Sequence, residues 1–323
     1  MQAIGGYFEL ADYETSTGFP HNEGILLNTG RNALEYILRS IGVIKRVYLP
    51  YYTCEVILEP LKKLQIPWVY YHINTSFEIV EDIIPKDGEY IIVNNYFGIK
   101  DAYIQALAGK YGDHLIVDCA QALFAKPLSG IKMFYSPRKY VGVADGGVAY
   151  LGGTSGRIVE VKGKECTADH DNHLYVRKQF GAEAGFEGFR VNETKLDNQP
   201  IRWMSETTKR ILDHIDYDKV IARRRANFAF LYAALQENNS LLLPNFDSFV
   251  SPMVYPFISK TSRSLRQKLI NEKVFVAKYW SNVNQLISYE IECKLADRVV
   301  AIPCDQRYGD EEMNRIVSII LSI

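Results

Sequence analysis

Short apolar runs alternate with helical repeats through the first half of the chain, and this alternation restricts the folds it can adopt. The apolar runs are each bounded by Gly, Pro, Asp or Asn; they cover residues 47–49, 68–71, 90–93, 115–117 and 148–151. Residues 30–41 and 53–64 instead carry apolar side chains at helical spacing. Such short runs are typical of strands buried on both faces. Strands that alternate with helices predict the α/β class, with a mostly parallel central sheet flanked by helices.

The pattern changes after about residue 163, where charged residues, Gly and Asn become frequent. Helical patterns then cover residues 204–235, 262–271 and 311–321, and strand-like pieces lie at 253–258 and 274–277. This mixture predicts a smaller α+β domain in the C-terminal part. We therefore expect a large α/β domain over residues 1–205 and a small α+β domain over residues 206–323.

The composition is that of a globular protein and argues against several classes of function. Of the 323 residues 47% are hydrophobic, and the formal net charge is -1. No run of five or more Lys and Arg occurs, so we expect neither nucleic acid nor a membrane as a partner. The five cysteines are widely spaced without a C-x-x-C pair, which predicts no metal site and a reducing compartment. Because no signal peptide or run of eighteen apolar residues is found, we expect a cytoplasmic protein.

Asp118 follows the apolar run 115–117, and Gln121 lies three residues later. Ligands of open α/β sheets bind beyond the carboxyl ends of the strands, so a carboxylate at this point is well placed for a site. One turn of helix after the strand would direct both side chains towards the same opening. Taken alone, Asp118 is also typical of a helix N-cap, and Gln121 is typical of the surface.

Lys139 lies just after Ser136 and shortly before the pair Gly146-Gly147. The Pro and Gly residues of this segment indicate a shaped loop between two strands. Most lysines are solvated, and position alone gives Lys139 no function. A lysine that forms a Schiff base must lose its proton part of the time, and partial burial in such a loop favours that state.

Thr29, Gly30 and Arg31 open the first clear helix. A helix start presents free backbone N–H groups and the positive end of the helix dipole, which suits a phosphate, and Gly30 would let the backbone approach closely. Taken alone, Thr29 is more typical of a simple helix N-cap. The chain contains neither G-x-x-x-x-G-K-[ST] nor G-x-G-x-x-G, so a P-loop and a dinucleotide site have no support.

Tyr52 follows the apolar run that ends at Leu49. Its ring could be presented to a flat cofactor at the end of that strand. Packing in the core is the more common fate of such an aromatic residue.

The order of these parts resembles that of the DegT/StrS family of sugar aminotransferases, within the fold type I enzymes that use pyridoxal 5'-phosphate (PLP). The similarity covers most of the chain. Residues 27–34 resemble the family's N-S-G-T-x-A-L helix start, and residues 49–53 its V-P-x-x-T-F segment. Residues 117–121 are similar to its D-x-A-Q motif, and Lys139 with residues 145–147 resembles its lysine followed by E-G-G. The last two matches are the most specific.

The resemblance implies a role for each candidate residue. Asp118 would pair with the pyridine nitrogen of PLP, and Gln121 would hydrogen-bond the hydroxyl side of the ring. The phosphate would lie against Thr29, Gly30 and Arg31 at the helix start, with Ser136 beside it. Lys139 would hold PLP as a Schiff base and carry the proton in catalysis.

The resemblance also implies an activity and an assembly. The chain would be an aminotransferase that moves an amino group from an amino acid, with glutamate as the expected donor, to a nucleotide-linked keto sugar, in surface polysaccharide or amino-sugar biosynthesis. Members of the family are homodimers with the active site at the subunit interface. Two alternatives stay open: a PLP-dependent lyase or aldolase acting on amino acids, and a ligand-binding protein that kept the fold without turnover.

Overall fold

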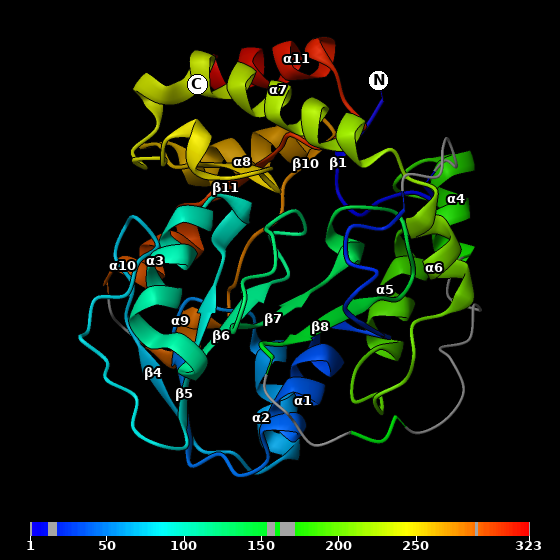
Figure 1. The fold of residues 1–323 in the computed structure, drawn as a ribbon. Coiled ribbons are helices and arrows are strands. Elements are labelled where there is room, and N and C mark those ends of the chain that lie inside the picture. The colour runs from blue at the N-terminus through cyan, green and yellow to red at the C-terminus, as the bar shows by residue number, and fades with distance from the viewer. Residues whose placement is uncertain (1, 12–17, 154–158, 162–171, 288–289, 323) are drawn as a thin grey trace.

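A seven-stranded sheet forms the centre of the molecule in a computed structural model that describes residues 2–11, 18–153, 159–161, 172–287 and 290–322 (Figure 1). The strand order is β2-β8-β7-β6-β5-β3-β4. The strands are β2 (Ile25–Leu27), β3 (Arg46–Pro50), β4 (Trp68–Tyr71), β5 (Glu89–Asn94), β6 (Leu115–Cys119), β7 (Lys132–Tyr135) and β8 (Gly147–Leu151). The five strands from β7 to β4 are parallel, and β8 is antiparallel to both of its neighbours. The predicted α/β class with a mostly parallel sheet is confirmed.

Both faces of the sheet are buried, as the continuous apolar runs predict. In β5, Ile91 and Val93 pack into one apolar cluster, whereas Ile92 packs into a second cluster on the opposite face. The second cluster contains the apolar side of α1 (Gly30–Ile41) and α2 (Leu58–Lys63). The helix α3 (Asp101–Tyr111) covers the other face together with elements from the second half of the chain (Figure 1).

Two strands of the sheet, β2 and β7, were absent from the expected apolar runs. The strand β2 has only three residues, and Lys132 interrupts the apolar pattern of β7. Lys132 is nevertheless 1% exposed. Its ammonium group donates to the carbonyl of Asp113 at 2.7 Å and lies 5.4 Å from the centre of the Tyr90 ring. These contacts let a charged side chain occupy a buried strand.

The expected long helix over residues 204–235 is two helices, α6 (Glu206–Asp213) and α7 (Tyr217–Leu235). Each has its own side-chain cap: Ser205 accepts from the amide of Thr208, and Asp216 accepts from the amide of Lys219. Asp216 therefore starts a new helix where the apolar spacing alone suggested continuity. Before them, α4 (Asn172–Phe180) and α5 (Phe186–Lys195) occupy the charged and Gly-rich region.

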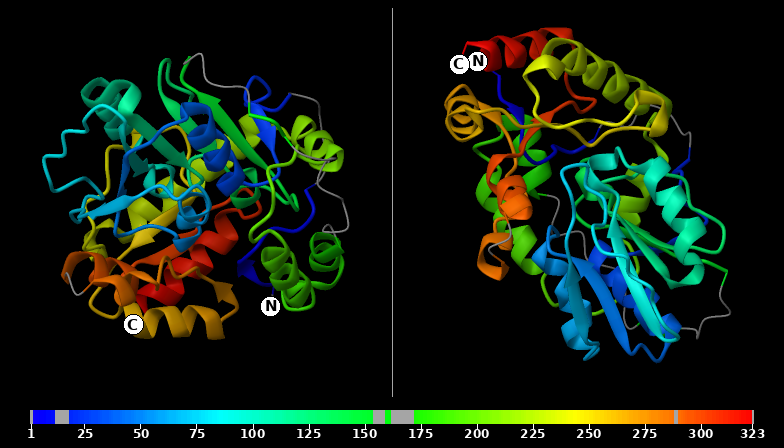
Figure 2. Two further views of the ribbon diagram at one scale, coloured as in Figure 1. Left: turned by 90° about the horizontal axis from the view of Figure 1, so that it is seen from below. Right: turned by 90° about the vertical axis from the view of Figure 1, so that its left-hand side faces the viewer.

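The remaining elements lie above the sheet in Figure 1, except for α9 and α10, which lie at the level of the sheet (Figures 1 and 2). They are β9 (Val254–Phe257), α8 (Ser262–Asn271), β10 (Val274–Phe275), α9 (Val283–Leu286), α10 (Glu290–Arg298), β11 (Val300–Pro303) and α11 (Asp310–Leu321). The strand β9 pairs with β11, and β10 pairs with β1 (Ile4–Gly5), so the N-terminal residues join these elements. The boundary at residues 205 and 206 stays a prediction. Among the described helices, none has the length and apolar character needed to cross a membrane.

We predict that Gly147→Ala lowers the free energy of unfolding by about 3 kcal/mol, the upper range for overpacking. A Cβ atom at Gly147 would lie 2.1 Å from the backbone oxygen of Thr29, so the start of α1 would have to move. Urea unfolding measures the change.

The matched control is Gly109→Ala in α3, where a Cβ atom meets no described atom within 4 Å. That substitution should stabilise the protein by about 0.5–1 kcal/mol because alanine favours a helix. Equal effects of the two substitutions would contradict the steric argument.

Candidate active site

Asp118 and Lys139 lie at the same edge of the sheet. Asp118 is near the carboxyl end of β6, and its register partner in β7 is Phe134. The chain leaves β7 at Tyr135, passes Ser136 and forms the short 3-10 turn Pro137–Lys139. Lys139 is partly buried, and its positive charge acts on the Asp118 carboxyl group. The structure thus brings together the two residues on which the expected site depends.

Burial raises the pKa of Asp118 above its ordinary value. The charge of Lys139 and a hydrogen bond from the Ala120 amide, at 2.8 Å, oppose this rise without cancelling it. Residues 120–131 are all described and contain no helix, so Asp118 is not a helix N-cap. The helical turn that was expected to align Asp118 and Gln121 is also absent there. A carboxylate in this position is stabilised by a cationic partner.

Gln121 is 4% exposed and is not a surface glutamine. Its Oε1 atom accepts from the Phe97 amide at 3.0 Å. Its Nε2 atom is buried and has no hydrogen-bond partner among the described residues. Buried donors are normally satisfied, so this amide group is suited to an acceptor atom of a bound molecule.

The start of α1 lies against the turn that carries Lys139. A Cβ atom at Gly30 would be 3.3 Å from the Cβ atom of Ser136, so the missing side chain leaves this junction open. The Thr29 hydroxyl accepts from the Asn32 amide at 3.0 Å. Thr29 therefore caps the helix, which was the alternative to a phosphate contact. The Nη1 atom of Arg31 pairs with both Glu59 and Asp197, so the side chain is engaged in ion pairs while its backbone lies in the first turn of α1.

The Asp145-Gly146-Gly147 segment holds this helix start in place. The Gly146 amide donates to the Asn28 carbonyl at 2.7 Å. Asp145 is buried and accepts hydrogen bonds from Ser205 and from the Thr208 hydroxyl at the start of α6. The two glycines that follow Lys139 in the sequence therefore position the neighbouring helix.

Tyr52 is fully buried in an aromatic cluster with Phe77, Tyr96 and Trp280. Its hydroxyl group donates to the Tyr279 carbonyl at 3.4 Å. It is not among the residues that line the cavity described next. Contact between Tyr52 and a cofactor stays a prediction.

A cavity of about 650 Å³ adjoins Lys139. Ser136, Arg138 and Lys139 contribute to its wall, whereas the other candidate residues do not. The rest of the wall includes residues 5–8, Arg177 of α4, and Phe186 and Phe189 of α5. Sequence reasoning missed these residues because no motif connects the N-terminal segment with α4; they meet only in the folded chain.

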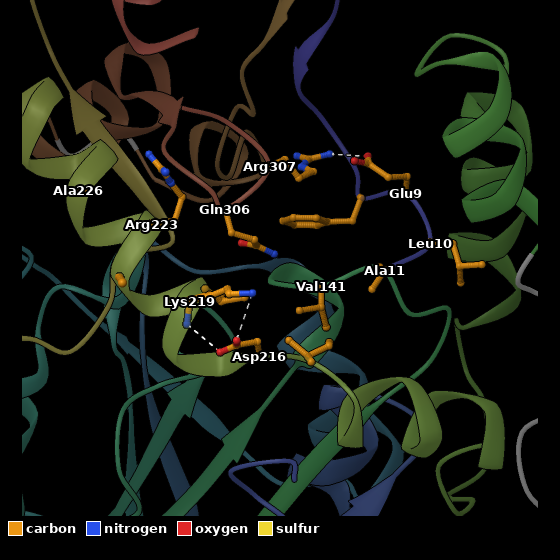
Figure 3. Close-up of a pocket in the computed structure, with 15 residues that line it drawn as sticks. Glu9, Leu10, Ala11, Val141, Asp216, Lys219, Arg223, Ala226, Gln306 and Arg307 are labelled. Atoms are coloured by element: carbon orange, nitrogen blue, oxygen red, sulfur yellow. Dashed lines mark hydrogen bonds and ion pairs between the residues drawn. The ribbon is translucent and has the colours of Figure 1, made fainter. Parts of the chain in front are cut away.

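A second cavity, of about 760 Å³, lies between residues 8–11 and the beginning of α7 (Figure 3). None of the eight candidate residues lines it. Arg307 faces Glu9 at this cavity, and its Nη1 atom donates to the Glu9 carboxylate at 3.0 Å (Figure 3). It also forms a two-point hydrogen bond with Asp305, at 2.8 and 3.0 Å. These bonds give Arg307 a structural role in the loop that precedes α11.

Comparison with known proteins identifies the architecture. A sugar aminotransferase from Micromonospora echinospora is similar over 92% of this chain and 86% of its own, with a TM-score of 0.62 and 17% identity. A DegT DnrJ EryC1 StrS aminotransferase from Brucella abortus has a TM-score of 0.62 and 16% identity over 92% and 85% of the two chains. The fold is that of the DegT/StrS-type sugar aminotransferases. The predicted fold type I architecture is thereby confirmed.

A third solved structure of this fold is a putative sugar aminotransferase from Streptococcus pneumoniae in its PMP form. It has a TM-score of 0.65 and 14% identity, and the match covers 97% of this chain and 93% of that one. No family model matches the chain, and a search of curated proteins found no match. At these identities the likeness establishes the fold, and the activity must be argued from the site.

We predict that Asp118→Asn raises the thermal midpoint of the PLP-free protein, by on the order of a degree or two for a chain of this size. A raised pKa means that the ionised carboxyl group is less favourable in the folded than in the unfolded chain, so Asp118 costs stability at neutral pH. Asparagine removes the charge and keeps an acceptor for the Ala120 amide. Differential scanning calorimetry at pH 7 measures the midpoint, and a lowered midpoint would refute the argument.

Proposed function

We propose that this chain is a PLP-dependent aminotransferase that moves an amino group from glutamate to a nucleotide-linked keto sugar. The observation that carries the proposal is the placement of Lys139 and Asp118 at one edge of the sheet, close enough for the lysine charge to act on the carboxyl group. Lys139 offers an amine that can bond to the aldehyde of PLP, and Asp118 offers a carboxylate that can pair with the ring nitrogen of PLP. The fold shared with sugar aminotransferases supports the same activity.

The residues at this edge fit PLP. The buried Nε2 atom of Gln121 is a donor without a partner among the described residues, and it suits the ring hydroxyl group. Gly30 and the Arg31 backbone at the start of α1, with Thr29 and Ser136 beside them, would hold the phosphate. No side chain of Gly30 obstructs the junction with Ser136. Helix starts favour phosphates because their first N–H groups lack partners within the helix.

PLP, when bound, supplies an aldehyde that bonds to amines and a ring that withdraws electrons from the attached carbon. Lys139 is the group that takes a proton from one carbon and returns it to another. Lys139 is partly buried and lines the cavity, so its side chain is within reach of a bound molecule. Asp118 would hold a proton on the ring nitrogen, and this ion pair would offset the desolvation that raises the pKa of its carboxyl group.

One related structure supports the proposed acceptor, and the family resemblance supports the proposed assembly. One further neighbour, DesI, was solved in the presence of its TDP-sugar product, with a TM-score of 0.60. A nucleotide-linked sugar is therefore the substrate class we assign to this chain, in polysaccharide or amino-sugar biosynthesis. We further propose a cytoplasmic homodimer, since the resemblance places the active site at a subunit interface.

Absorbance of the purified protein tests the activity. The parent should bind PLP and show the absorbance of the lysine-bound cofactor, and borohydride should attach PLP permanently to Lys139. Glutamate should abolish this absorbance, because an aminotransferase converts its cofactor to the amine form. Lys139→Ala should lose both responses, and the half-reaction should fall by at least about a thousandfold, as expected for loss of the covalent and proton-carrying group.

The matched control is Lys126→Ala, which removes an exposed lysine outside the site. It should leave absorbance and half-reaction unchanged. A parent protein that takes up no PLP would end the proposal. A parent that binds PLP but does not respond to any amino donor would instead indicate a lyase, an aldolase or a binding protein.

A further inference from the structure

Tyr140, the residue after Lys139, joins the lysine turn to the segment that follows Asp118. Its side chain is fully buried, and its hydroxyl group donates to the backbone carbonyl of Gln121 at 2.6 Å. Its amide donates to the Pro137 carbonyl at 2.8 Å, which closes the turn. The Tyr140 hydroxyl group therefore connects the turn after β7 with the loop after β6, at the edge of the sheet that carries the candidate site.

The segment after β5 is bonded to the same loop. The Asn95 amide donates to the Asp118 carbonyl at 2.9 Å, and the Phe97 amide donates to the Oε1 atom of Gln121 at 3.0 Å. Phe97 has a φ of 56°, a left-handed conformation that is uncommon for a residue with a side chain. Such a conformation persists only where the surrounding contacts hold it, as these hydrogen bonds do.

Gly98 lies where the three segments meet. Its φ is 69°, and a Cβ atom there would lie 2.8 Å from both the Gln121 carbonyl oxygen and the Tyr140 hydroxyl oxygen. These distances are too short for a nonbonded carbon atom, so a side chain at this position would push the hydroxyl group away from the carbonyl group. The hydrogen bond of Tyr140 therefore depends on the glycine.

The carbonyl group of Tyr140 is bonded to the second half of the chain. It accepts from the Nε2 atom of Gln306 at 2.7 Å and from the Nη2 atom of Arg224 at 3.2 Å. Arg224 belongs to α7 and is fully buried, and its guanidinium carbon lies 4.4 Å from the centre of the Tyr140 ring. Its Nη1 atom donates to the Met253 carbonyl at 3.2 Å, and the Met253 amide donates to the Phe97 carbonyl at 2.7 Å. The hydrogen bonds thus form a closed circuit through Tyr140, Arg224, Met253, Phe97 and Gln121.

We propose that Tyr140 is a positioning residue, which fixes the separation of Lys139 and Asp118 by bonding their two segments together. This inference rests on the proposed function, because the separation matters only if one cofactor contacts both residues. PLP would bond to Lys139 and pair with Asp118 across the same rigid ring, so a displacement of either residue weakens one of the two contacts. Tyr140 does not line the cavity beside Lys139, so it acts through the segments it joins and not on the cofactor itself.

The affinity of Tyr140→Phe for PLP tests the proposal. Phenylalanine keeps the aromatic ring and its packing and removes only the hydroxyl group. A titration of the PLP-free protein with PLP, followed by absorbance, gives the dissociation constant. This constant should rise about 3- to 10-fold, the loss expected when one hydrogen bond no longer holds the site together. An unchanged affinity for PLP in Tyr140→Phe would overturn the proposal.

Tyr217→Phe is the matched control. Tyr217 is also buried, its ring contacts Phe124 as the Tyr140 ring does, and its hydroxyl group donates to the Leu212 carbonyl at 2.6 Å. Each variant loses one buried hydrogen bond, so both should lower the thermal midpoint to a similar extent. Only Tyr140→Phe should weaken PLP binding. Equal weakening in the two variants would reveal a general loss of stability and refute the proposal.

A double-mutant cycle with Asp118→Asn separates positioning from a purely structural role. If Tyr140 places Lys139 relative to Asp118, the loss of the pairing carboxylate should reduce the effect of Tyr140→Phe on PLP affinity to less than about twofold. An equal effect of Tyr140→Phe in the parent and in Asp118→Asn would refute the inference.

Hydrogen exchange of the Phe97 amide tests the circuit in the PLP-free protein. This amide donates to Gln121, so it should exchange faster in Tyr140→Phe and at the parent rate in Tyr217→Phe. Unchanged exchange in both variants would refute the inference, whatever the affinity for PLP. A parent that takes up no PLP but shows the expected exchange would instead refute the proposed function, and the role assigned to Tyr140 would fall with it.

Discussion

The close approach of Gly147 to Thr29 is the constraint on which the candidate site depends. It brings the first turn of α1 against β8 and, through Gly30, against Ser136 in the segment that carries Lys139. Asp145 adds a buried hydrogen bond to the start of α6, and the Gly146 amide donates to the carbonyl of Asn28, just before α1. Two helix starts and the lysine turn are therefore fixed relative to one another by three consecutive residues. A larger residue at position 147 would separate the parts of the site.

Much of the fold follows from the sequence because its signals are local. The bounds of α1 agree with the predicted range 30–41, since Thr29 caps the helix and Gly42 follows its end. The strands β4 and β6 were expected from their apolar runs alone, without reference to contacts with distant residues. By contrast, β7 was missed because Lys132 is buried there through contacts with residues of other segments. The break before α7 was missed because Asp216 acts as a cap, a role that apolar spacing does not reveal.

The candidate site was also predictable only where its residues lie close together in the sequence. Motifs near one another in sequence located Asp118, Gln121 and Lys139, and the parallel register of β6 and β7 explains why they share one edge. The cluster of Glu9, Arg177 and Arg307 could not be predicted from the sequence, because its members are separated by more than a hundred residues. Neither Arg177 nor Glu9 has a local pattern that indicates a site. The helix expected after Asp118 also failed to form, and the Ala120 amide bonds to Asp118 in a turn instead.

The pairing of β1 with β10 has a consequence for biosynthesis. Residues 5–8 leave the ribosome long before residues 274 and 275, yet they line the cavity beside Lys139 only when Ile4 and Gly5 have paired with Val274 and Phe275. During translation the α/β sheet can form while this wall is still missing. Contacts of such sequence separation form slowly, because a long loop must close before they gain any stability. The nascent chain can therefore hold a folded sheet well before it has a closed cavity.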